Sequence, residues 1–157
     1  MLSANGLLSF NAMDTENKDV LPYGRRYWYP HLSHVEAAIW SRFIDQYPDA
    51  YDFVEYDVKI GPVPEFVSKH EDPAMQAQAP LYQYKIDVIG YRGADIEIIE
   101  LKEKAQFYTV GQVKGYVKVW SDEYQPPKAP KPVIICEQLA VKVSEYAKSE
   151  GVLVYVV

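Results

Sequence analysis

Residues 81–102 read LYQYKIDVIGYRGADIEIIELK, and this stretch decides the fold of the chain. It holds two short runs, Leu81–Tyr91 and Ala94–Lys102, in which apolar and polar residues alternate. Alternation with a period of two is typical of β-strands, and the tight Arg92-Gly93 connection is typical of a hairpin turn. The stretch therefore predicts two antiparallel strands joined by a short turn.

The hairpin is expected to bring two carboxylates and an amine together. Glu100 and Lys102 lie two residues apart and should project to the same face, while Leu101 turns inward and leaves its carbonyl oxygen near the same edge. Asp87 lies on the neighbouring strand, close to where Glu100 pairs. Two carboxylates and a carbonyl oxygen would supply half of a Mg²⁺ (or Mn²⁺) shell, a site suited to phosphodiester hydrolysis, with Lys102 placed to orient water or stabilise charge. The plainer alternative is a salt-bridge ladder on an exposed strand.

A second acid-x-lysine pattern, Asp57-Val58-Lys59, serves as an internal comparison. It lies in another alternating stretch, Asp52–Ile60, which predicts a half-buried strand. The apolar residues of this strand are expected on one side: Val54, Tyr56, Val58 and Ile60. Because no acidic hairpin partner precedes it, we interpret Asp57 and Lys59 as a solvated face, and we expect Asp57→Ala to leave activity unchanged.

The hydrophobic pattern of the remaining chain predicts further helices and strands. The expected elements are a helix from Ser33 to about Tyr47, the strand Asp52–Ile60, the hairpin, a helix from about Ala105 to Trp120, a strand over Val133–Cys136, a helix over about Gln138–Glu150 and a strand over Val152–Val157. This order predicts an α/β fold with a central mixed sheet flanked by helices, as one domain over residues 29–157. Residues 1–28 show no sustained period and are expected to form an N-terminal arm.

Two loops and two glycines are candidates for contact with a ligand. Residues 61–80 hold four prolines and few apolar residues, which predicts a long structureless loop of the kind that often binds or moves. Residues 128–131 belong to a proline-rich basic loop that could contact a nucleic-acid strand, although a solvated linker is the favoured interpretation. Gly111 and Gly115 lower helix stability, and their spacing suggests that something packs closely against that helix face.

Composition narrows the function classes. A chain of 157 residues with 48% hydrophobic and 24% charged residues is typical of one globular domain. Its net charge of −6 argues against a protein that coats duplex DNA electrostatically. The charge does not exclude a nuclease, whose local field would come from a bound metal and a few lysines.

The cysteine content and the absence of long apolar runs give further limits. Cys136 is the only cysteine, so one chain cannot build a disulfide, a cysteine zinc site or a cysteine-ligated iron–sulfur cluster. Its apolar surroundings in the sequence predict a small buried hydrophobe. We see no signal peptide and no run of about 20 apolar residues, which predicts a cytoplasmic protein without a membrane span.

One set of residues resembles the PD-(D/E)xK nuclease superfamily: Asp87, then Glu100-x-Lys102, then Gln112 and Tyr116 on the following helix. The branch it is most similar to carries Gln-x-x-x-Tyr on that helix. The resemblance implies a restriction-endonuclease-like αβββαβ core and a Mg²⁺- or Mn²⁺-dependent deoxyribonuclease. It also implies that Asp87 and Glu100 are metal ligands, that Lys102 is the catalytic lysine, and that Gln112 and Tyr116 contact the nucleic-acid backbone or brace the metal site.

Glu36 has two interpretations that stay open. It matches the acidic residue that the superfamily often carries on its first helix, which would make it part of the catalytic set. Equally, Ser33-x-x-Glu36 is a capping box, in which Glu36 satisfies a backbone N–H at the helix start. Two departures accompany the resemblance: Ile86 stands before Asp87, where proline is common, and the four cysteines of the cluster-bearing exonucleases are absent.

The partners follow from the same resemblance. The substrate would be single- or double-stranded DNA, and a homodimer or a partner DNA-processing subunit would supply the grip that an acidic surface lacks. The alternative is a catalytically inactive nuclease-like fold that serves nucleic-acid binding or assembly in a larger complex. A binding module whose tyrosines stack on single-stranded bases is a weaker third possibility, because the acidic balance argues against it.

Overall fold

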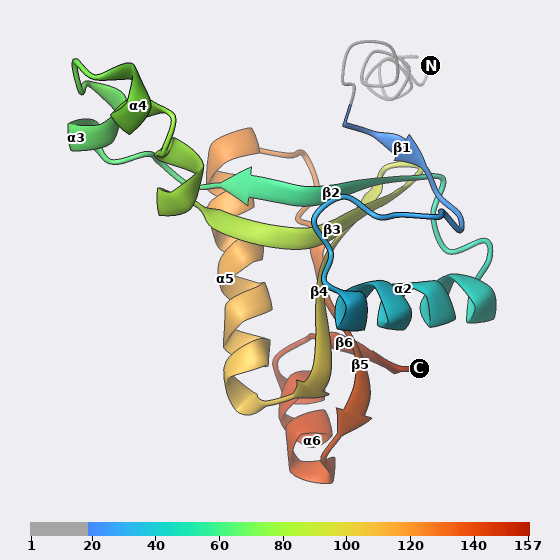
Figure 1. The fold of residues 1–157 in the computed structure, drawn as a ribbon. Helices are drawn as coiled ribbons and strands as arrows, with labels where there is room; N and C mark the ends of the chain where they lie inside the picture. Colours follow the sequence, from blue (N-terminus) through green and yellow to red (C-terminus); the bar gives the residue numbers. More distant parts are fainter. Residues whose placement is uncertain (1–18) are drawn as a thin grey trace, which may run out of the picture.

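A six-stranded mixed sheet forms the centre of the protein, whose computed structural model describes residues 19–157 (Figure 1). The strands are β1 (Leu21–Pro22), β2 (Phe53–Ile60), β3 (Tyr84–Arg92), β4 (Asp95–Ala105), β5 (Lys131–Leu139) and β6 (Leu153–Val156). They lie in chain order across the sheet. Strands β1 to β4 pair with one another in antiparallel fashion, whereas β4 with β5 and β5 with β6 pair in parallel. The predicted α/β class with a mixed sheet is confirmed.

Helices cover both faces of this sheet. Helix α2 (His34–Gln46) packs on one face, while α5 (Phe107–Tyr124) and α6 (Val141–Ser149) pack on the other (Figure 1). The alternation of β5 shows how the two layers share one strand, because Val133 and Ile135 face α2 whereas Ile134 and Cys136 face α5 and α6. The buried position predicted for Cys136 is confirmed.

Local sequence signals explain the elements that form the core. Helix α2 begins at the cap residue Ser33, and its side chains Ile39, Trp40, Phe43 and Ile44 are buried at three- and four-residue spacing. The β3–β4 hairpin closes where Arg92 pairs with Asp95, leaving Gly93 in the left-handed region at φ 56°. Glycine accepts that conformation without steric cost, and such turns match the twist of the flanking strands.

Several predicted boundaries change. The loop over residues 61–80 is not structureless: it holds the short helices α3 (Glu65–Ser68) and α4 (Pro73–Gln76), and a 3₁₀ turn η2 begins at Ala79. Helix α4 has a helix-start signal, since Asp72 caps it and Pro73 is its first residue. The turn η2 (Ala79–Tyr82) also takes the first residues of the predicted hairpin, so β3 starts at Tyr84.

Strand β5 and the predicted N-terminal arm also differ in detail from expectation. Strand β5 is longer than predicted, and it includes Lys131 and Pro132 from the expected loop and Gln138 from the expected helix. Within the predicted arm, β1 pairs with β2 at the edge of the sheet, and residues 1–18 lie outside the described part. Among residues 19–157, no helix has the length and apolar content needed to cross a bilayer.

Candidate acid–lysine site

Asp87 lies at the point where β3 and β4 part. The pairing of these strands runs from Arg92 opposite Asp95 to Val88 opposite Ile99, which brings Asp87 next to Glu100. There the backbone N–H of Leu101 donates a hydrogen bond of 2.9 Å to Oδ2 of Asp87. The carboxylate therefore bridges the two strands, and its side chain is buried.

Glu100 and Lys102 project together from β4, as the two-residue spacing predicts. Nζ of Lys102 lies 3.0 Å from Oε1 of Glu100, whose side chain is only 4% exposed, against 29% for the lysine. The second carboxylate oxygen, Oε2 of Glu100, is buried and has no hydrogen-bond partner among the described residues. Because buried polar atoms are almost always paired, this oxygen marks a position where a ligand atom would be favourable.

Burial and mutual repulsion make it unfavourable for Asp87 and Glu100 to be ionised together. Burial raises the pKa of Asp87 to about 6, and the negative charge of Glu36 adds to the rise. Burial also raises the pKa of Glu100 to about 7, with the charge of Asp87 as the second cause. Burial alone would lower the pKa of Lys102. The hydrogen bond to Glu100 and the negative charge of Glu100 raise the pKa overall, so the amine stays an ammonium.

The donor set fits a hard divalent cation. Two carboxylates with one unpartnered oxygen are the ligand type that Mg²⁺ and Mn²⁺ prefer, and a cation would relieve the repulsion between them. Within residues 19–157, no group of three or more His, Cys, Asp or Glu residues gathers at a metal-binding distance. A third protein ligand would therefore be a backbone oxygen, and the carbonyl of Leu101 remains the prediction for it.

Gln112 and Tyr116 share one face of α5, one turn apart. Nε2 of Gln112 donates a hydrogen bond of 2.8 Å to the hydroxyl of Tyr116. Burial raises the pKa of Tyr116, and the charges of Glu100 and Asp87 add to the rise, which places this phenol within electrostatic reach of the acid pair. A hollow of about 340 Å³ opens beside the two side chains, lined by Tyr84, Gly111, Gln112, Gly115, Tyr116 and Val119.

The two helical glycines are open rather than packed. A Cβ built on Gly111 or Gly115 would meet no described atom within 4 Å outside the helix's own backbone. The expectation that something packs closely against this face is therefore wrong for the described part of the chain. The space that both glycines leave is the hollow beside Gln112 and Tyr116.

The open face leads to a stability prediction. Gly111→Ala and Gly115→Ala are each expected to raise the free energy of unfolding by about 0.5–1 kcal/mol, because alanine restricts the unfolded chain and meets nothing in the folded one. Thermal unfolding followed by circular dichroism measures the change. Gly93→Ala is the matched control: its Cβ also has free space, but φ is 56°, so stability should fall. A destabilised Gly111→Ala variant would contradict the open face.

Glu36 forms the predicted capping box. Its Oε2 accepts a hydrogen bond of 2.8 Å from the N–H of Ser33, and Oγ of Ser33 accepts one of 3.2 Å from the N–H of Glu36. The charge of Glu36 nevertheless acts on both Asp87 and Glu100. The capping role is thus present in the structure, and a role in the catalytic set stays a prediction.

The comparison pattern on β2 is not a solvated face. The side chain of Asp57 is only 11% exposed and lies among Lys59, Lys85 and His31. This corrects the interpretation drawn from the sequence. Lys85 was also missed, although its place two residues before Asp87 is the same-face spacing used for Glu100 and Lys102.

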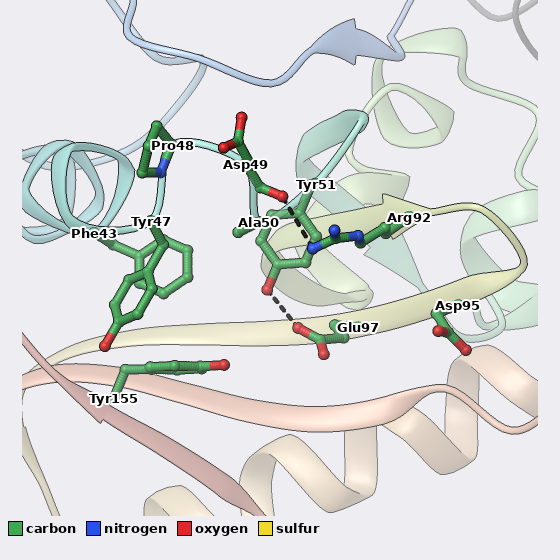
Figure 2. Close-up of a pocket in the computed structure, with 10 residues that line it drawn as sticks. All are labelled: Phe43, Tyr47, Pro48, Asp49, Ala50, Tyr51, Arg92, Asp95, Glu97 and Tyr155. Carbon is green, nitrogen blue, oxygen red and sulfur yellow. Dashed lines mark hydrogen bonds between the residues drawn. The ribbon is translucent and has the colours of Figure 1, made fainter.

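Another cavity, of about 420 Å³, lies away from the acid pair and is shown in Figure 2. Its polar groups are already engaged within the chain: Tyr51 donates a hydrogen bond to Glu97, and Arg92 donates one to the carbonyl of Asp49. Aromatic rings of Phe43, Tyr47 and Tyr155 form the opposite wall. Because Glu97 and Arg92 are engaged in this way, we do not assign the candidate chemistry to this cavity.

Comparisons with known proteins concern the fold. No protein-family model matches the chain, and no curated protein matches it. A repair endonuclease from Pyrococcus abyssi is similar with 20% identity and a TM-score of 0.48, over 85% of this chain and 49% of that chain. An EndoMS-dsDNA2 complex shows 16% identity and a TM-score of 0.46, over 85% and 48% of the two chains. EndoMS in apo form shows 22% identity and a TM-score of 0.38, over 45% and 33%. The chain thus spans at most about half the length of these structures.

Proposed function

We propose that this protein is a metal-dependent deoxyribonuclease that hydrolyses phosphodiester bonds at Asp87, Glu100 and Lys102. The observation that supports the proposal best is the unpartnered, buried Oε2 of Glu100, next to a second buried carboxylate and an ammonium. A purely structural ion pair is expected to leave both carboxylate oxygens paired, as is usual for buried polar atoms. An arrangement that lacks one ligand is instead expected of a metal site.

Each residue of the chain has a separate task in this proposal. Asp87 and Glu100 would hold Mg²⁺ or Mn²⁺, which when bound lowers the pKa of water and polarises the phosphate. Lys102 is protonated, so it donates hydrogen bonds to a phosphoryl oxygen and neutralises charge that develops there, rather than removing a proton from water. Gln112 and Tyr116 offer hydrogen-bonding groups to the adjacent backbone of the DNA strand.

The substrate must be held against an unfavourable overall charge. A chain with net charge −6 repels DNA except where local cations and a bound metal reverse the field. A homodimer or a partner DNA-processing subunit would add the missing contact area. The alternative function, binding or assembly without turnover, uses the same residues. The hydrogen bond from Leu101 to Asp87 would then serve only to join β4 to β3, and the ion pair of Glu100 with Lys102 only to neutralise a buried charge.

Asp87→Asn tests the proposal most directly. The amide can still accept the hydrogen bond from Leu101, so the strands stay joined, but a charged ligand is lost. We expect cleavage of labelled single- or double-stranded DNA to require Mg²⁺ or Mn²⁺ and to fall by about 10²-fold or more in the variant. Asp95→Asn, on the same hairpin and paired with Lys128, is the matched control and should cleave normally. DNA binding without cleavage in either metal would favour the alternative.

A further inference from the structure

Two residues in an unusual backbone conformation meet beside β2. Asp57 has φ 53° and His31 has φ 56°, backbone angles that are uncommon outside glycine, although Asp and His adopt them more often than most residues. Nδ1 of His31 lies 3.9 Å from Oδ2 of Asp57. Strained backbone of this kind gathers at functional sites, where the surrounding structure holds it in place.

At Asp57 the apolar side chains of β2 change from one side of the sheet to the other. Val54 and Tyr56 belong to the core on the side of α2, whereas Val58 and Ile60 pack on the side of α5. The register nevertheless continues without a shift, since Tyr56 pairs with Val88 and Val58 with Ile86. Asp57 therefore stands directly opposite Asp87, the first residue of the proposed site.

The carboxylate of Asp57 gathers basic groups at this position. Its Oδ1 lies 3.0 Å from Nζ of Lys59 and 3.6 Å from Nζ of Lys85. The aspartate is 11% exposed, but the lysines are 33% and 38% exposed, so their ammonium groups keep access to solvent. Two ammonium groups and the imidazole of His31 lie against this carboxylate, so the two lysines exceed its charge by one, while Asp19 and Glu55 line the adjoining hollow.

A purely structural role explains little of this arrangement. Partly exposed ion pairs contribute little to stability, so they do not offset a strained backbone. A face switch alone could use glycine, or asparagine, which shares aspartate's tolerance of this conformation, and neither carries a charge. The charge of Asp57 therefore needs another explanation, and what it holds in place is a pair of lysines. The charge of Lys85 acts on Asp87, which indicates that this lysine lies near the acid site.

We propose that Asp57 is a positioning residue that holds Lys59 and Lys85 as a phosphate-binding site. The site would bind a phosphate of the DNA backbone adjacent to the phosphate that is cleaved. This inference rests on the proposed function for its substrate, and it adds a contact outside the acid–lysine set. Asp57 itself does not touch the phosphate; it acts through the two ammonium groups. Its loss should raise KM for DNA and leave kcat nearly unchanged.

Binding of a fluorescein-labelled oligonucleotide in EDTA, followed by anisotropy at increasing KCl, tests the site without cleavage. Asp57→Asn keeps the size and the backbone preference of the residue and removes only its charge. We expect the Kd to rise 5- to 10-fold and the slope of log K against log salt to fall by about 0.7–0.9, the value of one phosphate contact. Removing a negative charge without a positioning effect would do the opposite and tighten binding.

Asp95→Asn is the matched control, because it removes an aspartate that pairs with one lysine, Lys128, at the far end of the hairpin. It should bind DNA at least as tightly as the wild type. If Asp57→Asn folds poorly, the double variant Lys59→Gln, Lys85→Gln tests the same site through exposed side chains and should bind DNA weakly. The single variant Lys85→Arg keeps the positive charge and should bind DNA as the wild type does. Wild-type affinity in a folded Asp57→Asn variant or in the double lysine variant, or no measurable binding by the wild type, would overturn the inference.

The outcomes separate this inference from the proposed function. A wild type that binds DNA but does not cleave it, with weakened binding in Asp57→Asn, would remove the nuclease and keep the phosphate site. A wild type that cleaves DNA with the same KM as Asp57→Asn would keep the nuclease and remove the phosphate site.

Discussion

Lys102→Met is expected to lower kcat for DNA cleavage by about 10²–10³-fold, the loss typical of removing one donor that stabilises transition-state charge. Methionine keeps the length and apolar stem of the side chain, so packing on β4 changes little. The fold should persist, because Glu100 can take up a proton when its ammonium partner is lost: burial already raises its pKa to about 7. The Kd for DNA should change much less than kcat, because one ammonium is a small part of the contact with the strand.

Lys104→Met is the matched control for this variant. Lys104 also lies on β4, two residues further along, but its side chain is exposed. Single-turnover cleavage at saturating enzyme with Mn²⁺ measures the rate, and circular dichroism checks the fold. A Lys102→Met rate within threefold of the wild type, or an equal loss in Lys104→Met, would show that the lysine is not part of the reaction.

The hairpin could be predicted because two independent signals agreed. Alternation defined the strands, and the short connection with Gly93 left one reasonable register, which set Asp87 near Glu100. The spacing of Glu100 and Lys102 then placed both on one face. Convergence of these three residues was thus readable from the sequence, whereas burial depth and the free oxygen of Glu100 depend on packing by distant segments.

Strand β2 shows where sequence patterns stop being sufficient. Val54, Tyr56, Val58 and Ile60 form a regular alternation that predicts one buried side. In the structure the first two side chains face α2 and the last two face α5, with Asp57 in the left-handed conformation between them. A period-two pattern contains no signal for such a switch, and for this reason the cluster around Asp57 was missed.

Short helices were missed for a related reason. Helices α3 and α4 each contain four residues, too few to show a 3.6-residue period. Only the cap and first residue of α4, Asp72 and Pro73, indicate its position, and prolines in the same stretch favour a loop. By contrast, the capping box at Ser33 was readable from sequence because it needs only two residues at fixed spacing.

Glu100→Gln is expected to stabilise the protein at pH 8 while it removes cleavage. A buried acid whose pKa is raised on folding binds its proton more tightly in the folded state. Its contribution to stability is therefore fully present at pH values below the unfolded pKa of about 4.3 and is lost as the pH rises through the folded pKa of about 7. Ionised Glu100 thus destabilises the fold at pH 8 by on the order of 3–4 kcal/mol, and glutamine removes that cost. For a chain of this length the gain corresponds to roughly 6–16 °C in Tm.

Thermal unfolding between pH 5 and pH 8, with and without Mn²⁺, measures this exchange of stability for function. The Tm of the wild type should fall as the pH rises, and the profile of Glu100→Gln should be flatter. Mn²⁺ should raise the wild-type Tm at pH 8, because a cation that binds only the folded state stabilises it, and should have little effect on the variant. Equal Mn²⁺ stabilisation of both proteins would place the metal away from Glu100. A variant that is less stable than the wild type at pH 8 would mean that the ion pair with Lys102 outweighs the burial of the charge.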